Sequence, residues 1–81
     1  MQITVKHFAI VRERASVGEI QLSLSKDATV ASAERVLAEK FPPIADLLPR
    51  AAFAVNQTYA SCDTVLHDGD ELAVIPPVSG G

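Results

Sequence analysis

The sequence has few of the residues that usually support catalysis or cross-linking. Its 81 residues include one cysteine, one tyrosine and no tryptophan. The single cysteine, Cys62, excludes an internal disulfide and suits a reducing compartment, so we expect a cytoplasmic protein. The first residues alternate in polarity and lack the apolar run of a signal peptide. No stretch approaches the length of a membrane span, and we expect no membrane partner.

Positive charge is also scarce. The formal net charge is −3, and the two clustered cations, Arg12 and Arg14, are separated by Glu13. Proteins that bind nucleic acid usually carry a basic stripe or patch, so we expect no nucleic-acid partner. The length allows one domain with one core and leaves little room for an internal active-site cavity.

Alternation of polar and apolar residues predicts two strands in the first quarter of the chain. Residues 2–8 alternate with Ile3 and Val5 on the inner face. Residues 9–18 carry mixed charges and are expected to form a turn region. The following run alternates again and places three apolar side chains inward, at Ile20, Leu22 and Leu24.

The period changes to that of a helix over residues 27–41. Thr29 is a suitable N-cap, and Pro42 with Pro43 ends the helix. Residues 44–48 are expected to form one short extra turn. The apolar face of the helix consists of Val30, Ala33, Leu37 and Phe41.

The last third predicts three more strands. A strand with Phe53 and Val55 inward leads through a turn at Asn56-Gln57 into a short second strand. Asp68-Gly69 is a strong turn signal, and the strand after it places Leu72 and Val74 inward.

The resulting order is β-β-α-β-β-β in an α+β domain. One helix must cover one face of one mixed sheet, because the strands alternate instead of being apolar throughout. This order matches the β-grasp, or ubiquitin-like, fold, in which the first and last strands pair in parallel. We expect the domain to cover residues 1–76 and a flexible extended tail to cover residues 77–81.

The residues that most often take part in catalysis or metal binding have no suitable partner residues in this sequence. His7 and His67 have no metal-ligand partner at a suitable spacing and are expected to be surface or boundary histidines. Cys62 has no identifiable general base, which favours a partly buried structural cysteine. The acidic run at 67–71 fits a solvated turn better than a metal loop.

Strand phase points instead to an apolar surface. Phe8 is in phase with the outward polar residues of its strand, and Ile75 is in phase with Glu71 and Ala73. The first and last strands are neighbours in a β-grasp sheet, so Phe8 and Ile75 are expected to share one outer patch with Tyr59 nearby. A clustered patch of this kind indicates partner binding. The alternative is that Phe8 tucks under the following loop.

The last six residues, PPVSGG, suggest a functional chain end. Pro76 and Pro77 cannot donate ladder hydrogen bonds, so they end the sheet. Gly80 and Gly81 lack Cβ atoms and fit a narrow channel. The unusual group that they deliver is a terminal carboxylate. The alternative is an inert end, since termini are often disordered.

Four segments together resemble the small subunits of molybdopterin synthase, the MoaD family of ubiquitin-like sulfur carriers: FAIVRE at 8–13, AVNQT at 54–58, DGDELA at 68–73 and PPVSGG at 76–81. The resemblance implies that an E1-like enzyme of the MoeB type adenylates the Gly81 carboxylate with ATP. It implies a thiocarboxylate at Gly81, which donates sulfur to cyclic pyranopterin monophosphate (precursor Z) and so builds the dithiolene of molybdopterin. No cofactor is implied for the chain itself.

The resemblance also implies the partner surfaces. A large subunit of the MoaE type would supply the catalytic residues, form a heterotetramer with this chain and contact Phe8, Tyr59 and Ile75. Arg12 matches an arginine of the family, with a role either in structure beside the tail or in an interface ion pair. The segment inserted into the large subunit would be Pro77, Val78, Ser79 and Gly80, with Gly81 at the reacting end.

Three other readings stay open. One is a sulfur carrier for thiamine, for tRNA thiolation or for a tungsten cofactor. Another is a ubiquitin-like modifier that is joined to lysines. The last is an interaction domain with an inert tail.

Overall fold

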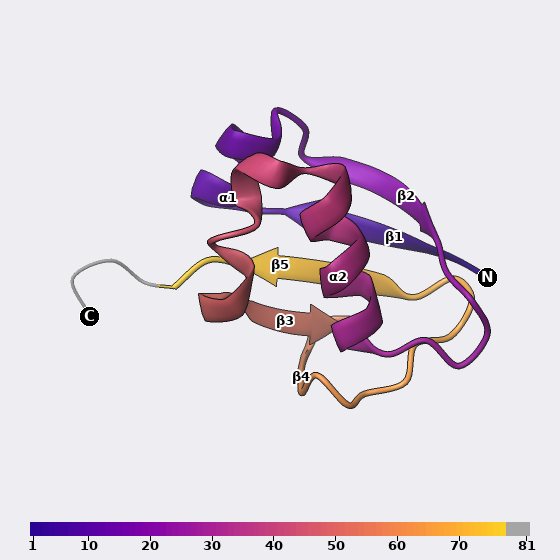
Figure 1. Ribbon diagram of the computed structural model, residues 1–81. Coiled ribbons are helices and arrows are strands. Elements are labelled where there is room, and N and C mark those ends of the chain that lie inside the picture. The colour runs from indigo at the N-terminus through magenta and orange to yellow at the C-terminus, as the bar shows by residue number, and fades with distance from the viewer. Residues whose placement is uncertain (78–81) are drawn as a thin grey trace.

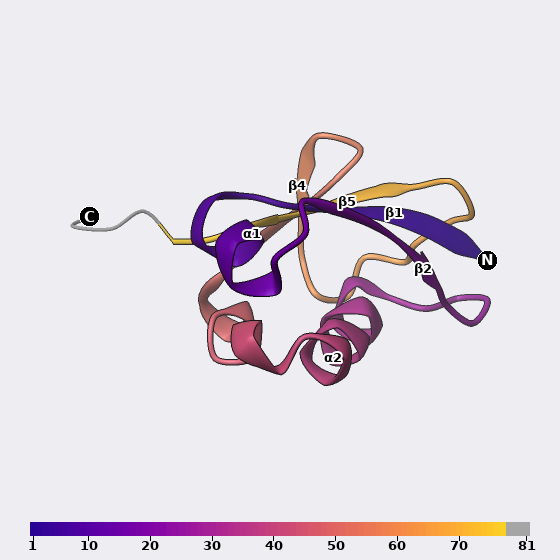
Figure 2. The same cartoon turned by 90° about the horizontal axis from the view of Figure 1, so that it is seen from above.

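The computed structural model describes residues 1–77, which form a five-stranded mixed sheet with one long helix across one face (Figures 1 and 2). The strand order is β2-β1-β5-β3-β4, with β1 and β5 parallel and every other neighbouring pair antiparallel. The predicted β-grasp fold is confirmed. The strands are β1 Gln2–His7, β2 Glu19–Ser23, β3 Ala52–Val55, β4 Thr58–Ala60 and β5 Glu71–Ile75.

Helix α2 (Val30–Lys40) covers the inner face of the sheet. Thr29 caps it as predicted, because its hydroxyl accepts from the Ser32 amide while the Ser32 hydroxyl accepts from the Thr29 amide. The helix ends at Lys40, before Pro42. Nine of the predicted inward residues are buried, whereas Ile20, Leu24, Phe41 and Val55 are only partly buried against the core. The buried ones are Val30, Ala33, Leu37, Ile3, Val5, Leu22, Phe53, Leu72 and Val74.

The prediction of a turn region over residues 9–18 is wrong, because Ala9–Ala15 form a helix, α1. A seven-residue helix is marginal by itself, so tertiary contacts must hold it. Val11 is fully buried, and Arg14 forms an ion pair of 3.2 Å with Asp46. Asp46 belongs to the segment after α2, which forms two 3-10 turns, η1 (Pro42–Ile44) and η2 (Leu48–Arg50), instead of the single extra turn expected there.

The predicted hairpin turn at Asn56-Gln57 is present. Both residues have positive φ, 50° and 70°, as in a type I′ turn. Hydrogen bonds from Asn56 tie the turn to the start of β5: its Nδ2 donates to Asp70 Oδ1 at 2.9 Å, and its Oδ1 accepts from the Glu71 amide at 3.0 Å. The hairpin that carries Tyr59 therefore has a fixed position beside β5.

Two predictions about single residues are wrong. His7 is 3% exposed and continues the inward phase of β1. Its Nδ1 donates to the Val17 carbonyl at 2.9 Å, and its ring stacks edge-on against Phe41. Cys62 is exposed rather than partly buried. Its backbone carbonyl accepts a hydrogen bond from the Ala31 amide at 3.0 Å, and this contact ties the segment to α2 without burying the thiol. His67 is exposed, as predicted.

The boundary between domain and tail stays a prediction. β5 ends at Ile75, and Val78–Gly81 lie outside the described residues. Within residues 1–77, none of the helices combines the length and the hydropathy needed to cross a membrane.

Candidate functional site

Small residues form the floor of the candidate site on the open face of the sheet. The register places Tyr59 opposite Ala54, Ala54 opposite Ala73, and Ala73 opposite Lys6, so these four residues form one row across four strands. Ala54 and Ala73 are buried although no helix covers them. Two methyl groups in the middle of the row leave a depression between larger side chains at its ends.

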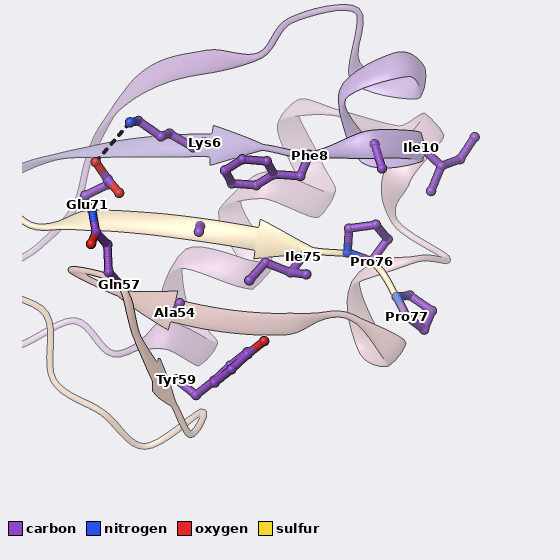
Figure 3. A pocket seen from close by; sticks show the side chains of 12 residues that line it. Lys6, Phe8, Ile10, Ala54, Gln57, Tyr59, Glu71, Ile75, Pro76 and Pro77 are labelled. Atoms are coloured by element: carbon purple, nitrogen blue, oxygen red, sulfur yellow. Dashed lines mark ion pairs between the residues drawn. The ribbon is translucent and has the colours of Figure 1, made fainter. Parts of the chain in front are cut away.

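Large apolar side chains form the walls of this depression, which we call the outer groove (Figure 3). Phe8 and Tyr59 lie on opposite sides of Ile75, and they are 45% and 74% exposed. The groove has a volume of about 870 Å³. Its lining residues are Lys6, Phe8, Ala9, Ile10, Ala54, Gln57, Tyr59, Glu71, Ala73, Ile75, Pro76 and Pro77.

The two ends of the outer groove differ in character. At one end Lys6 forms an ion pair of 3.2 Å with Glu71 (Figure 3). At the other end lie Pro76 and Pro77, the last described residues of the chain. A molecule bound along the groove would therefore contact the beginning of the segment that continues into residues 78–81.

Backbone geometry keeps Phe8 on the open face. Phe8 is extended, with φ −120° and ψ 150°, and Ala9 then reverses the chain with a φ of 51°. The Phe8 carbonyl accepts from the amides of Val11 and Arg12, which starts α1. The structure thus has Phe8 partly open in the groove, and not tucked under the following loop.

Arg12 does not line the outer groove. It lies next to it, in a smaller hollow that shares Lys6, Phe8 and Ala9 with the groove. Of the predicted partner-binding residues, the structure therefore gathers Phe8, Tyr59 and Ile75 in one place and leaves Arg12 at the border. Of the segment predicted to enter the large subunit, the structure describes Pro77, which lines the outer groove. Val78–Gly81 lie outside the described residues.

The loop before β5 carries the one clear pKa shift among the described residues. Burial raises the pKa of Asp70, but hydrogen bonds from Asn56 and from the His67 amide, together with the nearby His67 ring, lower it by more. The resulting pKa lies below the ordinary 3.8. These contacts stabilise the loop and lie away from the apolar walls. Within residues 1–77, no group of three His, Cys, Asp or Glu residues could hold a metal ion.

Eight of the twelve residues that line the outer groove were not predicted from the sequence as site residues: Lys6, Ala9, Ile10, Ala54, Gln57, Glu71, Ala73 and Pro76. Strand phase had placed Lys6 and Ala73 outward, and that signal could have identified the floor once the strand order was known. Ile10 gave no signal, because it belongs to the helix that was expected to be a turn.

The fold and the groove define a ubiquitin-like β-grasp domain with an open apolar surface. The ThiS family matches residues 5–81, which include the final Gly-Gly. The molybdopterin synthase sulfur carrier subunit of Chlamydomonas reinhardtii is 37% identical over 83 aligned residues, which cover all of both chains. The chain belongs to the ThiS family and, within it, to the molybdopterin synthase sulfur carrier subunits.

Solved structures share the whole fold. SAMP1 from Haloferax volcanii superposes with a TM-score of 0.89 at 28% identity, with complete coverage of both chains. A putative molybdopterin converting factor, subunit 1, from Pyrococcus furiosus has a TM-score of 0.88 at 29% identity, over 96% of this chain and 99% of that one.

Proposed function

We propose that this chain is the sulfur carrier subunit of a molybdopterin synthase and that its working group is the C-terminal carboxylate of Gly81. The outer groove is the observation that carries the proposal. Phe8, Tyr59 and Ile75 form an exposed apolar surface, and Pro76 and Pro77 close one end of it. A partner that docks there would meet the start of the tail, and the family match extends through the tail to Gly81.

The chemistry at Gly81 requires activation, because a carboxylate is a poor electrophile. An E1-like enzyme of the MoeB type would join the carboxylate to the AMP part of ATP and release pyrophosphate. A sulfur nucleophile would then displace AMP from the acyl carbon, which yields a thiocarboxylate. ATP is used by the activating enzyme, and the chain itself needs no bound cofactor.

The large subunit, of the MoaE type, would receive the activated tail. The segment Pro77, Val78, Ser79 and Gly80 would enter its active site, where the two glycines pass a channel too narrow for larger side chains. Sulfur would pass from Gly81 to cyclic pyranopterin monophosphate, and two transfers would complete the dithiolene. In this proposal the large subunit supplies the catalytic groups and forms a heterotetramer with this chain. The complex would work in the cytoplasm.

Reconstitution tests the proposal. The thiocarboxylated chain, the large subunit from the same organism and cyclic pyranopterin monophosphate are mixed, and the dithiolene product is measured by mass spectrometry. We expect product from the thiocarboxylated chain and none from the carboxylate form or from a chain without Gly81. Absence of product from well-folded thiocarboxylated protein would contradict the proposal.

The similarity to SAMP1, which is named a small archaeal modifier protein, supports a second candidate, a protein modifier. A modifier would form an isopeptide bond between Gly81 and a lysine of another protein. Intact-mass measurement after expression with the activating enzyme separates the two. A carrier gains the mass change of one oxygen replaced by one sulfur, whereas a modifier appears as conjugates with other proteins.

A further inference from the structure

Strand β2 forms one edge of the sheet, and among residues 1–77 no strand lies on its outer side (Figure 1). Its pairing with β1 is unbroken from Glu19 to Ser23, so no bulge bends the edge away. The strand at the opposite edge, β4, has three residues, whereas β2 has five, with neither lysine nor proline among them. Shortness, bulges, lysine and proline are common protections of an edge strand, and β2 has none of these.

The backbone groups of alternate β2 residues point away from β1. Just beyond the strand, Met1 and Leu24 exchange two hydrogen bonds of 2.9 Å. Such pairs recur at every second position of an antiparallel ladder, so the β2 residues that bond to β1 are Ile20 and Leu22. The amides and carbonyls of the three remaining residues therefore face the open edge: Glu19, Gln21 and Ser23.

The side chains of β2 leave this edge uncovered. Gln21 Nε2 donates to Thr4 Oγ1 at 2.8 Å, and Ser23 Oγ accepts from Gln2 Nε2 at 3.4 Å. Both β2 side chains therefore lie back over β1, on the open face of the sheet. The edge presents a row of backbone donors and acceptors to which a further strand can pair.

Two hollows of about 430 and 460 Å³ lie between β2 and α2. They share Ser23 and Val36, so they form one depression, which we call the edge groove. Its charged lining residues form no ion pair within residues 1–77: Lys26, Arg35, Lys40, Asp27 and Glu39. A surface with open charges of both signs can pair with a copy of itself, whereas a surface of one sign would repel its copy.

We propose that the β2 edge is a self-association surface, where two copies of the chain pair antiparallel about a two-fold axis at Gln21. In this register Gln21 lies opposite Gln21 of the second copy, and Glu19 lies opposite Ser23. All three outward positions then face outward positions, so each pair exchanges two hydrogen bonds. The two Glu19 carboxylates stay apart, and Ile20 meets Leu22 of the other copy on the inner face.

This dimer is compatible with the proposed function but does not depend on it. The edge groove and the outer groove have no lining residue in common. The two-fold axis is perpendicular to the combined sheet, so both copies present their outer grooves on the same face. One particle would therefore carry two outer grooves and two chain ends.

Sedimentation equilibrium of the full chain, from about 10 µM to 2 mM, tests the proposal. We expect a dissociation constant of about 0.1–1 mM, because one strand edge is a small contact. The weight-average mass should therefore rise with concentration toward twice that of the monomer.

Charge exchange at Gln21 tests the register. Gln21→Lys and Gln21→Glu should each weaken the dimer about 5-fold, because like charges then meet at the axis. An equimolar mixture of the two variants should dimerise at least as tightly as the wild type, because opposite charges meet. Thr58→Lys, on the β4 edge, is the control with the same change in charge and should dimerise like the wild type. Lysine brings the net charge of −3 closer to zero, so general repulsion predicts no weakening.

NMR spectroscopy locates the contact. In a dilution series the amides of Glu19, Gln21 and Ser23 should show the largest shifts, and they should be protected from hydrogen exchange at high concentration alone. Gln21→Pro should stay monomeric at 2 mM, because it removes an amide that faces the open edge, where proline is tolerated. Circular dichroism establishes that each variant is folded, and the lysine and glutamate variants test the contact even if Gln21→Pro does not fold.

Three outcomes would overturn the proposal. The first is the mass of a monomer at every concentration. The second is a dilution series whose shifts map to the outer groove, which would mean association through its apolar side chains. The third is a mixture of the Gln21 variants that dimerises no better than either variant alone, which would place another residue opposite Gln21. All three leave the proposed function intact, because dithiolene formation tests that function separately.

Discussion

Replacing Tyr59 by alanine should separate docking from folding. Tyr59 is 74% exposed, so little of its side chain supports the fold. An aromatic side chain presents about 200 Å², of which roughly 150 Å² is therefore open to a partner. If the large subunit covers half of that, about 75 Å² is lost in the variant, which corresponds to about 2 kcal/mol at 25 cal/mol per Å² and to an affinity about 30-fold lower.

Isothermal titration calorimetry with the large subunit measures this change. Val65→Ala is the matched control, because Val65 is 43% exposed but does not line the outer groove. Both variants should melt within a few degrees of the wild type, and Val65→Ala should keep wild-type affinity. Tyr59→Phe should retain most of the affinity, because the ring supplies the buried area.

Equal affinity of Tyr59→Ala and the wild type would refute the docking role of the outer groove. The same holds if Val65→Ala weakens binding as much as Tyr59→Ala, because the effect would then be a general loss of exposed apolar area. In either case the tail would have to find its partner through another surface.

Three further predictions concern the fold. Leu37→Ala should lower the free energy of unfolding by about 2–5 kcal/mol in urea titrations, because Leu37 is fully buried on the inner face of α2. Ionised Asp70 stabilises the fold above its ordinary pKa of 3.8, and this contribution is lost as the pH falls through the lowered folded-state pKa. Stability of Asp70→Asn should therefore fall less than that of the wild type on acidification, measured by denaturation at several pH values. His7 donates from Nδ1 to a carbonyl, so ¹⁵N NMR should show the neutral ring protonated at Nδ1, and a ring protonated at Nε2 alone would contradict the described contact.

Alternation predicted the sheet well because each strand has one buried and one open face. Ile3, Val5, Leu72 and Val74 occupy the positions that the period of two requires, and all are buried. Helix α2 was equally predictable, since its apolar face and its N-cap at Thr29 depend only on residues that are close in sequence. Pairing of β1 with β5 is not local, and it was inferred from the order of the elements rather than from any residue.

Helix α1 could not be predicted from its own residues. It contains one fully buried side chain, Val11, and its N-cap residue makes no side-chain capping bond. Its first residue, Ala9, has a left-handed backbone conformation. Such a helix exists because packing and the ion pair from Arg14 stabilise it, and neither is visible as a sequence period.

The candidate site was predictable at its outward-facing apolar strand residues and not at Ala54 or at Ile10 of α1. Phe8 and Ile75 are conspicuous because they are apolar at outward positions. Ala54 gives no such contrast, although its lack of bulk opens the groove beside Tyr59. His7 was misjudged for a similar reason: its polarity suggested the surface, whereas its phase with Ile3 and Val5 indicated the core.

The parallel pair of β1 and β5 has a consequence for how the protein is made. Phe8 follows one of these strands and Ile75 ends the other, so the outer groove is assembled from opposite ends of the described chain. Pairs so distant in sequence form late in folding, because a long loop must close first. A nascent, truncated or partly unfolded chain therefore has no groove. A partner that binds the outer groove, as proposed, would therefore bind only chains that have completed folding.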